Sequence, residues 1–163
     1  MNIRNKADKA VQERLLKGMT YELIPLNNLA DQSMFLPDGS TVSVTCSPAK
    51  TIDDTLDLCA HYSSQGFTAI PHLPARLVED EEHVERIVRR INELGIRKVF
   101  CIGGDAEPRG PFTDTAGFLR SFLDRRPGIN AVGVGSYPDG HSTVPDQALI
   151  DGPIEKQGMI REA

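Results

Sequence analysis

The sequence predicts an α/β protein built from repeated strand–helix units. Five short apolar runs of strand length, rich in β-branched residues, alternate with segments in which apolar residues recur at helical spacing. From the second run onward the runs begin at residues 41, 68, 98 and 131. Units of roughly 30 residues are typical of parallel strands joined by crossover helices.

The length of the chain narrows the architecture. Its 163 residues fit one domain, and a complete eight-unit barrel needs about 250 residues. Two architectures remain at this point, an open doubly wound sheet and part of a closed (β/α)8 TIM barrel. We expect an N-terminal helix within residues 1–18 and about five parallel βα units within residues 19–163.

The individual elements follow from local patterns. The expected strands are residues 21–25, 41–46, 68–73, 98–102 and 131–136. The first helix spans residues 3–17, with Ile3, Val11 and Leu15 on a narrow apolar stripe that Gly18 ends. Further helices are expected from Thr51 to Gly66, along Val84–Leu94, along 116–123 before Pro127-Gly128, and along 144–163 with an interruption at Gly152-Pro153.

Composition excludes several classes of protein. A formal net charge of −5 disfavours nucleic-acid binding. There is no apolar run of membrane-spanning length and no apolar secretory signal near Met1. Cys46, Cys59 and Cys101 lie far apart, which is typical of reduced thiols in a cytoplasmic protein. The chain also lacks the glycine-rich P-loop and Rossmann patterns.

Polar side chains follow nearly every expected strand, at the edge where parallel α/β proteins bind ligands. Glu22 lies in the first strand, His72 near the end of the third and Gly103-Gly104-Asp105 after the fourth. Each also has a plain structural interpretation: Glu22 as an edge carboxylate facing water, His72 as a hydrogen-bonded core histidine, and the glycines as a turn. Their recurrence at strand ends favours a ligand site.

These residues leave three classes of function open. In the first, a redox or one-carbon enzyme holds a flat cofactor over the strand ends, with Glu22 as proton donor and Asp105 bonded to the ring system. In the second, a metal-dependent lyase or hydrolase uses Glu22, His72, Asp105 and His141 as ligands, although neither HxH nor HExxH occurs. The third is a ligand-binding or incomplete domain without activity.

Five short motifs occur in order over residues 20–163. They are Glu22-Leu23-Ile24-Pro25, Val44-Thr45, His72-Leu73-Pro74-Ala75, Gly103-Gly104-Asp105 and Tyr137-Pro138-Asp139-Gly140-His141. This set resembles the methylenetetrahydrofolate reductase family, whose barrel carries E-F-F-P-P, V-T, H-L-T-C, R-G-D and Y-P-E-x-H at the corresponding strands.

The resemblance implies a cofactor, a reaction and a set of site residues. The family binds FAD, which NADH or NADPH reduces, and converts 5,10-methylenetetrahydrofolate to 5-methyltetrahydrofolate. By this resemblance Glu22 is the general acid and Asp105 contacts flavin and pterin. The cofactor-binding residues would be Thr45, Cys46, Ala49, His72, Gly103, Gly104, Asp105, Tyr137 and His141, with no metal site. The expected partner is the folate substrate, and the formation of a homo-oligomer is left open.

The departures from the family pattern are specific. Gly103 replaces the arginine of R-G-D, Leu26 replaces the second proline, and H-L-P-A replaces H-L-T-C. Strands six to eight of the barrel, which contact folate in that family, have no counterpart before Ala163. We therefore expect a divergent member represented by about five-eighths of a barrel, with weak or no activity of this chain by itself.

Overall fold

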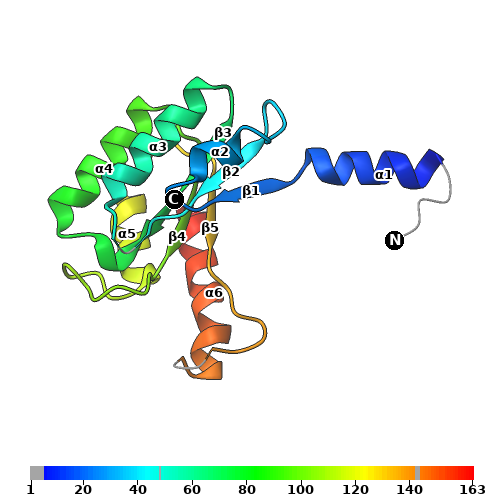
Figure 1. The fold of residues 1–163 in the computed structure, drawn as a ribbon. Helices are drawn as coiled ribbons and strands as arrows, with labels where there is room; N and C mark the ends of the chain where they lie inside the picture. Colours follow the sequence, from blue (N-terminus) through cyan, green and yellow to red (C-terminus); the bar gives the residue numbers. More distant parts are fainter. Residues whose placement is uncertain (1–5, 48, 142–143) are drawn as a thin grey trace.

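The computed structural model describes residues 6–47, 49–141 and 144–163 and shows an α/β fold. Strands and helices alternate from β1 onward (Figure 1). In chain order they are α1 (Lys6–Lys17), β1 (Thr20–Leu23), α2 (Leu29–Ser33), β2 (Thr41–Val44), α3 (Ile52–Ser64), β3 (Thr68–Pro74), the 3₁₀ helix η1 (Ala75–Leu77), α4 (Glu81–Glu93), β4 (Lys98–Ile102), α5 (Thr115–Asp124), β5 (Ala131–Val134) and α6 (Asp146–Glu162).

The five strands form one parallel sheet in the order β1-β2-β3-β4-β5. The central strand β3 pairs with β2 through Thr68–Pro71 and with β4 through His72–Pro74. Pro71, which has no N–H to donate, lies where one ladder gives way to the next. Because strands in a barrel are staggered in this way, the architecture is consistent with part of a βα barrel.

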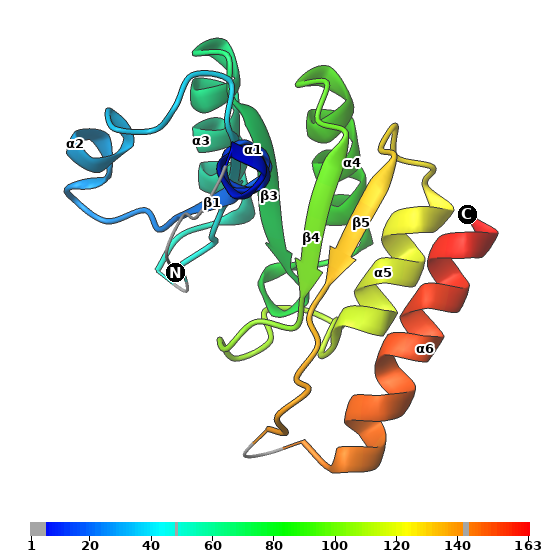
Figure 2. The same cartoon turned by 90° about the vertical axis from the view of Figure 1, so that its right-hand side faces the viewer.

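The two faces of the sheet differ in character. Val44, Leu73 and Cys101 are fully buried and belong to the hydrophobic core. The alternate residues, which include Glu22 and Ser43, point to the opposite face, which we call the inner face. Figures 1 and 2 show the main helices α3, α4 and α5 gathered on one side of the strands.

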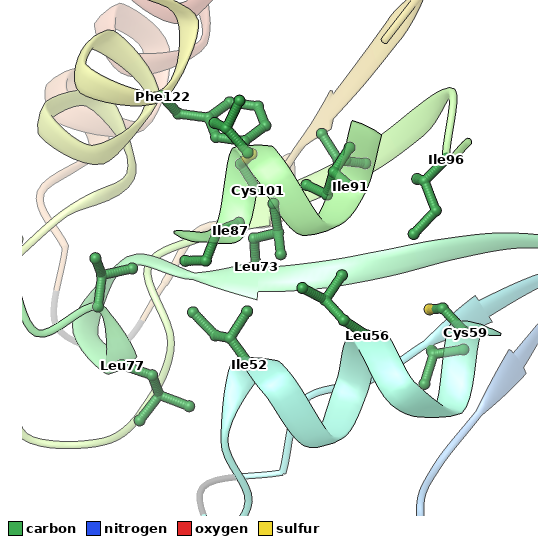
Figure 3. Close-up of a cluster of buried hydrophobic side chains, with 14 of the residues drawn as sticks. Ile52, Leu56, Cys59, Leu73, Leu77, Ile87, Ile91, Ile96, Cys101 and Phe122 are labelled. Carbon is green, nitrogen blue, oxygen red and sulfur yellow. The ribbon is translucent and has the colours of Figure 1, made fainter. Parts of the chain in front are cut away.

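The core lies between β3 and the helices α3 and α4, which precede and follow it in the chain (Figure 3). Ile52 and Leu56 of α3 and Ile87 and Ile91 of α4 are fully buried around β3. Two of the thiols are also part of this core, and burial raises the pKa of Cys59 and Cys101 to about 12. Both cysteines are therefore structural residues with unreactive thiols.

The helices begin where their capping residues predict. Thr51 caps α3: its hydroxyl accepts from the Asp54 N–H at 3.0 Å, while the Asp54 carboxylate accepts from the Thr51 N–H at 2.8 Å. Asp80 caps α4 through the His83 N–H, and Asp114 caps α5 in the same manner. Capping thus fixes the starts of the helices that cover β3 and β4.

Several expected boundaries were wrong. Strands β1, β2 and β5 end two residues earlier than expected, at Leu23, Val44 and Val134, because ladder pairing stops there. The expected interruption at Gly152-Pro153 is also wrong. Helix α6 continues past Pro153, which removes only one backbone donor, and α6 packs against α5.

Other differences concern elements that the sequence patterns did not mark. The short helix α2 and the 3₁₀ turn η1 had no periodic signal, since neither is longer than five residues. The first helix extends over Lys6–Lys17, whereas Ile3 lies outside the described residues. Figure 1 shows α1 projecting from the rest of the fold, and its Leu15 and Leu16 are largely exposed. Within the described ranges, no helix combines the length and apolarity needed to cross a membrane.

A close backbone contact generates a test of this packing. A Cβ atom at Gly110 would overlap the backbone carbonyl of Glu79, so we expect Gly110→Ala to lower the free energy of unfolding by roughly 1–3 kcal/mol. As the matched control, Gly158→Ala in α6 meets open space and should raise stability by about 0.5–1 kcal/mol. Urea unfolding measures both; an equal effect of the two substitutions would contradict the described loop packing.

Candidate functional site

Three polar side chains meet on the inner face of the sheet. Glu22 of β1 is the register partner of Ser43 in β2. The Ser43 hydroxyl oxygen lies 3.0 Å from His72 Nε2, across to β3. A carboxylate, a hydroxyl and an imidazole therefore occupy neighbouring positions on three consecutive strands.

His72 is the most buried member of this group, with 8% of its surface exposed. Its imidazole packs against the Phe100 ring at a centroid distance of 4.9 Å. Burial lowers the pKa of His72 from the usual 6.5, and the negative charge of Glu22 partly opposes this effect. The imidazole is therefore neutral at neutral pH, with one ring nitrogen as donor and the other as acceptor.

A glycine on β5 makes room for Phe100. Gly133 is the register partner of Phe100, and a Cβ atom there would overlap the aromatic ring. The absence of a side chain at this position lets the Phe100 ring lie across β5 while it contacts His72. The row His72–Phe100–Gly133 thus extends the site across the second half of the sheet.

The loop after β4 carries the expected Gly103-Gly104-Asp105 segment. Gly104 has a φ of +86°, and a Cβ atom there would come within 2.9 Å of the Pro74 side chain. The Gly103 carbonyl accepts a hydrogen bond from the Arg76 N–H at 3.1 Å. These contacts tie the loops after β3 and β4 together, while the Asp105 side chain is exposed to solvent.

The segment after β2 contains three of the expected cofactor-binding residues. The Thr45 hydroxyl donates to the Leu23 carbonyl at 2.9 Å, so it links β2 to β1. Cys46 is half-buried, and burial raises the pKa of its thiol; a hydrogen bond with Thr55 and, to a smaller degree, the charge of Arg109 oppose this effect. Ala49 is exposed in the loop that leads into α3.

The segment after β5 brings two of the expected aromatic residues together. The Tyr137 and His141 rings meet edge to face at a centroid distance of 4.8 Å. Tyr137 also lines a cavity of about 470 Å3, together with Gly135 and, from α6, Lys156. This cavity lies next to the beginning of α5, whose first residue Thr115 also lines it.

The structure brings some of the expected residues into contact and leaves others apart. Glu22 and His72 interact electrostatically on the inner face, and Tyr137 contacts His141 after β5. In the part of the chain that the structure describes, no three histidine, cysteine, aspartate or glutamate side chains are grouped closely enough to hold a metal ion.

Three residues of the site had not been singled out from the sequence as functional. Ser43 and Phe100 flank His72, and the charge of Arg109 acts on Cys46. The strict alternation in Thr41–Val44 places Ser43 opposite to the buried valines, so it was a signal for the face on which Ser43 lies.

A scan of the chain against models of known protein families finds no match.

The packing of His72 leads to a titration prediction. Because burial is the main cause of its lowered pKa, Phe100→Ala should expose the imidazole and raise the pKa of His72 towards 6.5. Titration of the ring protons by NMR measures this change. Phe35→Ala removes a phenylalanine that is already 82% exposed and should leave the titration unchanged; the same response in both variants would argue against the described contact.

Proposed function

We propose that this protein is a flavin-dependent oxidoreductase of one-carbon metabolism. Its substrate would be 5,10-methylenetetrahydrofolate, its product 5-methyltetrahydrofolate, and its reductant NADH or NADPH. The single observation that carries the proposal is the cluster of Glu22, Ser43 and His72 on the inner face of a parallel sheet. Two of these residues, together with Asp105 after β4, match the motifs that suggested the reductase family.

The role proposed for Glu22 is proton donation. Reduction of the folate adds a hydride to the methylene carbon, breaks the bond from that carbon to one ring nitrogen, and places a proton on the nitrogen. Glu22 is exposed on the inner face, where it can reach a substrate laid over the strand ends. A carboxylic acid that faces a bound substrate in this way is suited to general acid catalysis.

The donor set at the strand ends fits a flavin. His72, Asp105, Tyr137 and the backbone of Gly103-Gly104 offer hydrogen bonds and a flat approach from three strand ends. The cavity beside Tyr137 adds Lys156, a cation suited to a phosphate group. Bound FAD would accept a hydride from the nicotinamide and deliver it to the folate.

The family pattern has an arginine at the position of Gly103, so this chain lacks that positive charge. Two other arginines, Arg76 and Arg109, lie near this loop. Arg76 follows β3 and its Nε donates to the Thr113 carbonyl at 3.0 Å. The Arg109 N–H donates to the Arg76 carbonyl at 2.8 Å, which holds the two residues together. The charge of Arg109 also opposes the rise in the pKa of Cys46, which follows β2. We therefore propose that Arg109 supplies the positive charge at the strand ends.

Flavin binding is the first test. The protein should be yellow when purified or after incubation with FAD, with the visible absorption bands of a bound flavin. Lys156→Gln should weaken the retention of FAD through the loss of one phosphate contact, by about tenfold in Kd. Lys17→Gln, at the exposed end of the projecting helix α1, is the matched control and should keep the affinity. A colourless protein that binds no flavin would refute the proposal.

The role of Glu22 can be separated from flavin reduction. In the flavin-loaded protein Glu22→Gln should reduce turnover of the folate by a factor of roughly 100 or more, because the amide cannot act as a general acid. Oxidation of NAD(P)H with an artificial acceptor needs no such acid and should continue. Full folate turnover by the variant would show that Glu22 is not the proton donor.

A further inference from the structure

The hydroxyl of Ser43 has a place in the site that the family motifs do not assign. We propose that Ser43 is a positioning residue that orients the His72 imidazole, two residues further along the sheet than Glu22, and joins the two groups into one proton-exchanging unit. The inference rests on the proposed function for the part that Glu22 plays in turnover. The relative positions of the three side chains follow from the register of the sheet and do not depend on that function.

The geometry places Ser43 between the other two groups. In the strand order β1-β2-β3, Ser43 pairs in register with Glu22 on one side and lies 3.0 Å from His72 Nε2 on the other. On the far side of the imidazole, towards β4, the Phe100 ring packs at a centroid distance of 4.9 Å. The ring is therefore held between an apolar contact and one polar contact to the hydroxyl.

The same geometry argues against Ser43 as a nucleophile. In a serine triad the acid orients the histidine from the side remote from the serine, whereas here Glu22 and His72 lie on opposite sides of Ser43. Ser43 also lies inside strand β2, where the backbone is engaged in the ladder. It does not lie on a strand-to-helix turn of the kind that offers N–H groups to an oxyanion.

A hydroxyl can transmit a proton because it both donates and accepts. When the imidazolium Nε2–H donates to Ser43 Oγ, the Ser43 O–H can turn to the Glu22 carboxylate. Transfer of both protons breaks one N–H and one O–H bond and forms two O–H bonds. The products are a neutral imidazole with its proton on Nδ1, an intact Ser43 hydroxyl and a neutral carboxylic acid at Glu22.

Few other charges face this unit. From β1 the charged group is Glu22, and it acts on His72. On the inner face β2 presents Thr41 and Ser43, and β4 presents Lys98 two residues before Phe100. Lys98 is exposed and has no resolved effect on His72. The protonation of His72 is therefore expected to report mainly on Glu22.

The first experiment needs no cofactor. NMR follows the titration and the tautomer of His72 in the 163-residue chain, with and without Glu22→Gln. In the chain that keeps Ser43, removal of the Glu22 charge should lower the pKa of His72, because that charge raises it. In Ser43→Ala this effect should shrink and the tautomer should change, whereas Ser43→Thr, which keeps the hydroxyl, should restore both. Thr41→Ala, on the same face of the same strand, is the matched control and should behave as the wild type.

The second experiment measures turnover in the flavin-loaded protein. Ser43→Ala should lower kcat for the folate about tenfold with little change in KM, shift its pH dependence, and be rescued by Ser43→Thr. An unchanged tautomer and an unchanged effect of Glu22→Gln in Ser43→Ala would overturn the inference even if the protein is a flavoenzyme. Failure to bind flavin would instead refute the proposed function, and the NMR result would still decide the role of Ser43.

Discussion

The burial of one face of the sheet is the constraint on which the site depends. Because side chains alternate along a strand, placing Leu73 in the core under α3 and α4 directs its neighbour His72 to the inner face. The same alternation places Ser43 between two fully buried valines, Val42 and Val44. The free energy that holds these polar residues in place therefore comes from apolar contacts on the other side of the strands.

The fold class and the position of each strand could be predicted from the sequence, because period-2 and helical patterns alternate clearly. Strand ends could not, since ladder pairing rather than composition stops β1 at Leu23. The continuity of α6 through Pro153 also escaped prediction, because packing on α5 outweighs one missing donor.

The candidate site was predictable in part for a related reason. Motifs identify residues such as Glu22 and Asp105 one strand at a time. The contact between Ser43 and His72 is diagonal, since Ser43 pairs in register with Ile70. It depends on the stagger between strands, which no single segment of sequence records. Gly133 is a similar case, because the need for a glycine there depends on the Phe100 ring of the neighbouring strand, which a Cβ atom at Gly133 would overlap.

The change of partner along β3 has a consequence for the position of His72. One ladder joins β1, β2 and Thr68–Pro71, and the other joins His72–Pro74, β4 and β5. One hydrophobic core covers both ladders, and within the described sheet they meet at the peptide between Pro71 and His72. The hydrogen bond between Ser43 and His72 therefore joins a residue of the first ladder to a residue of the second on the face opposite to that core.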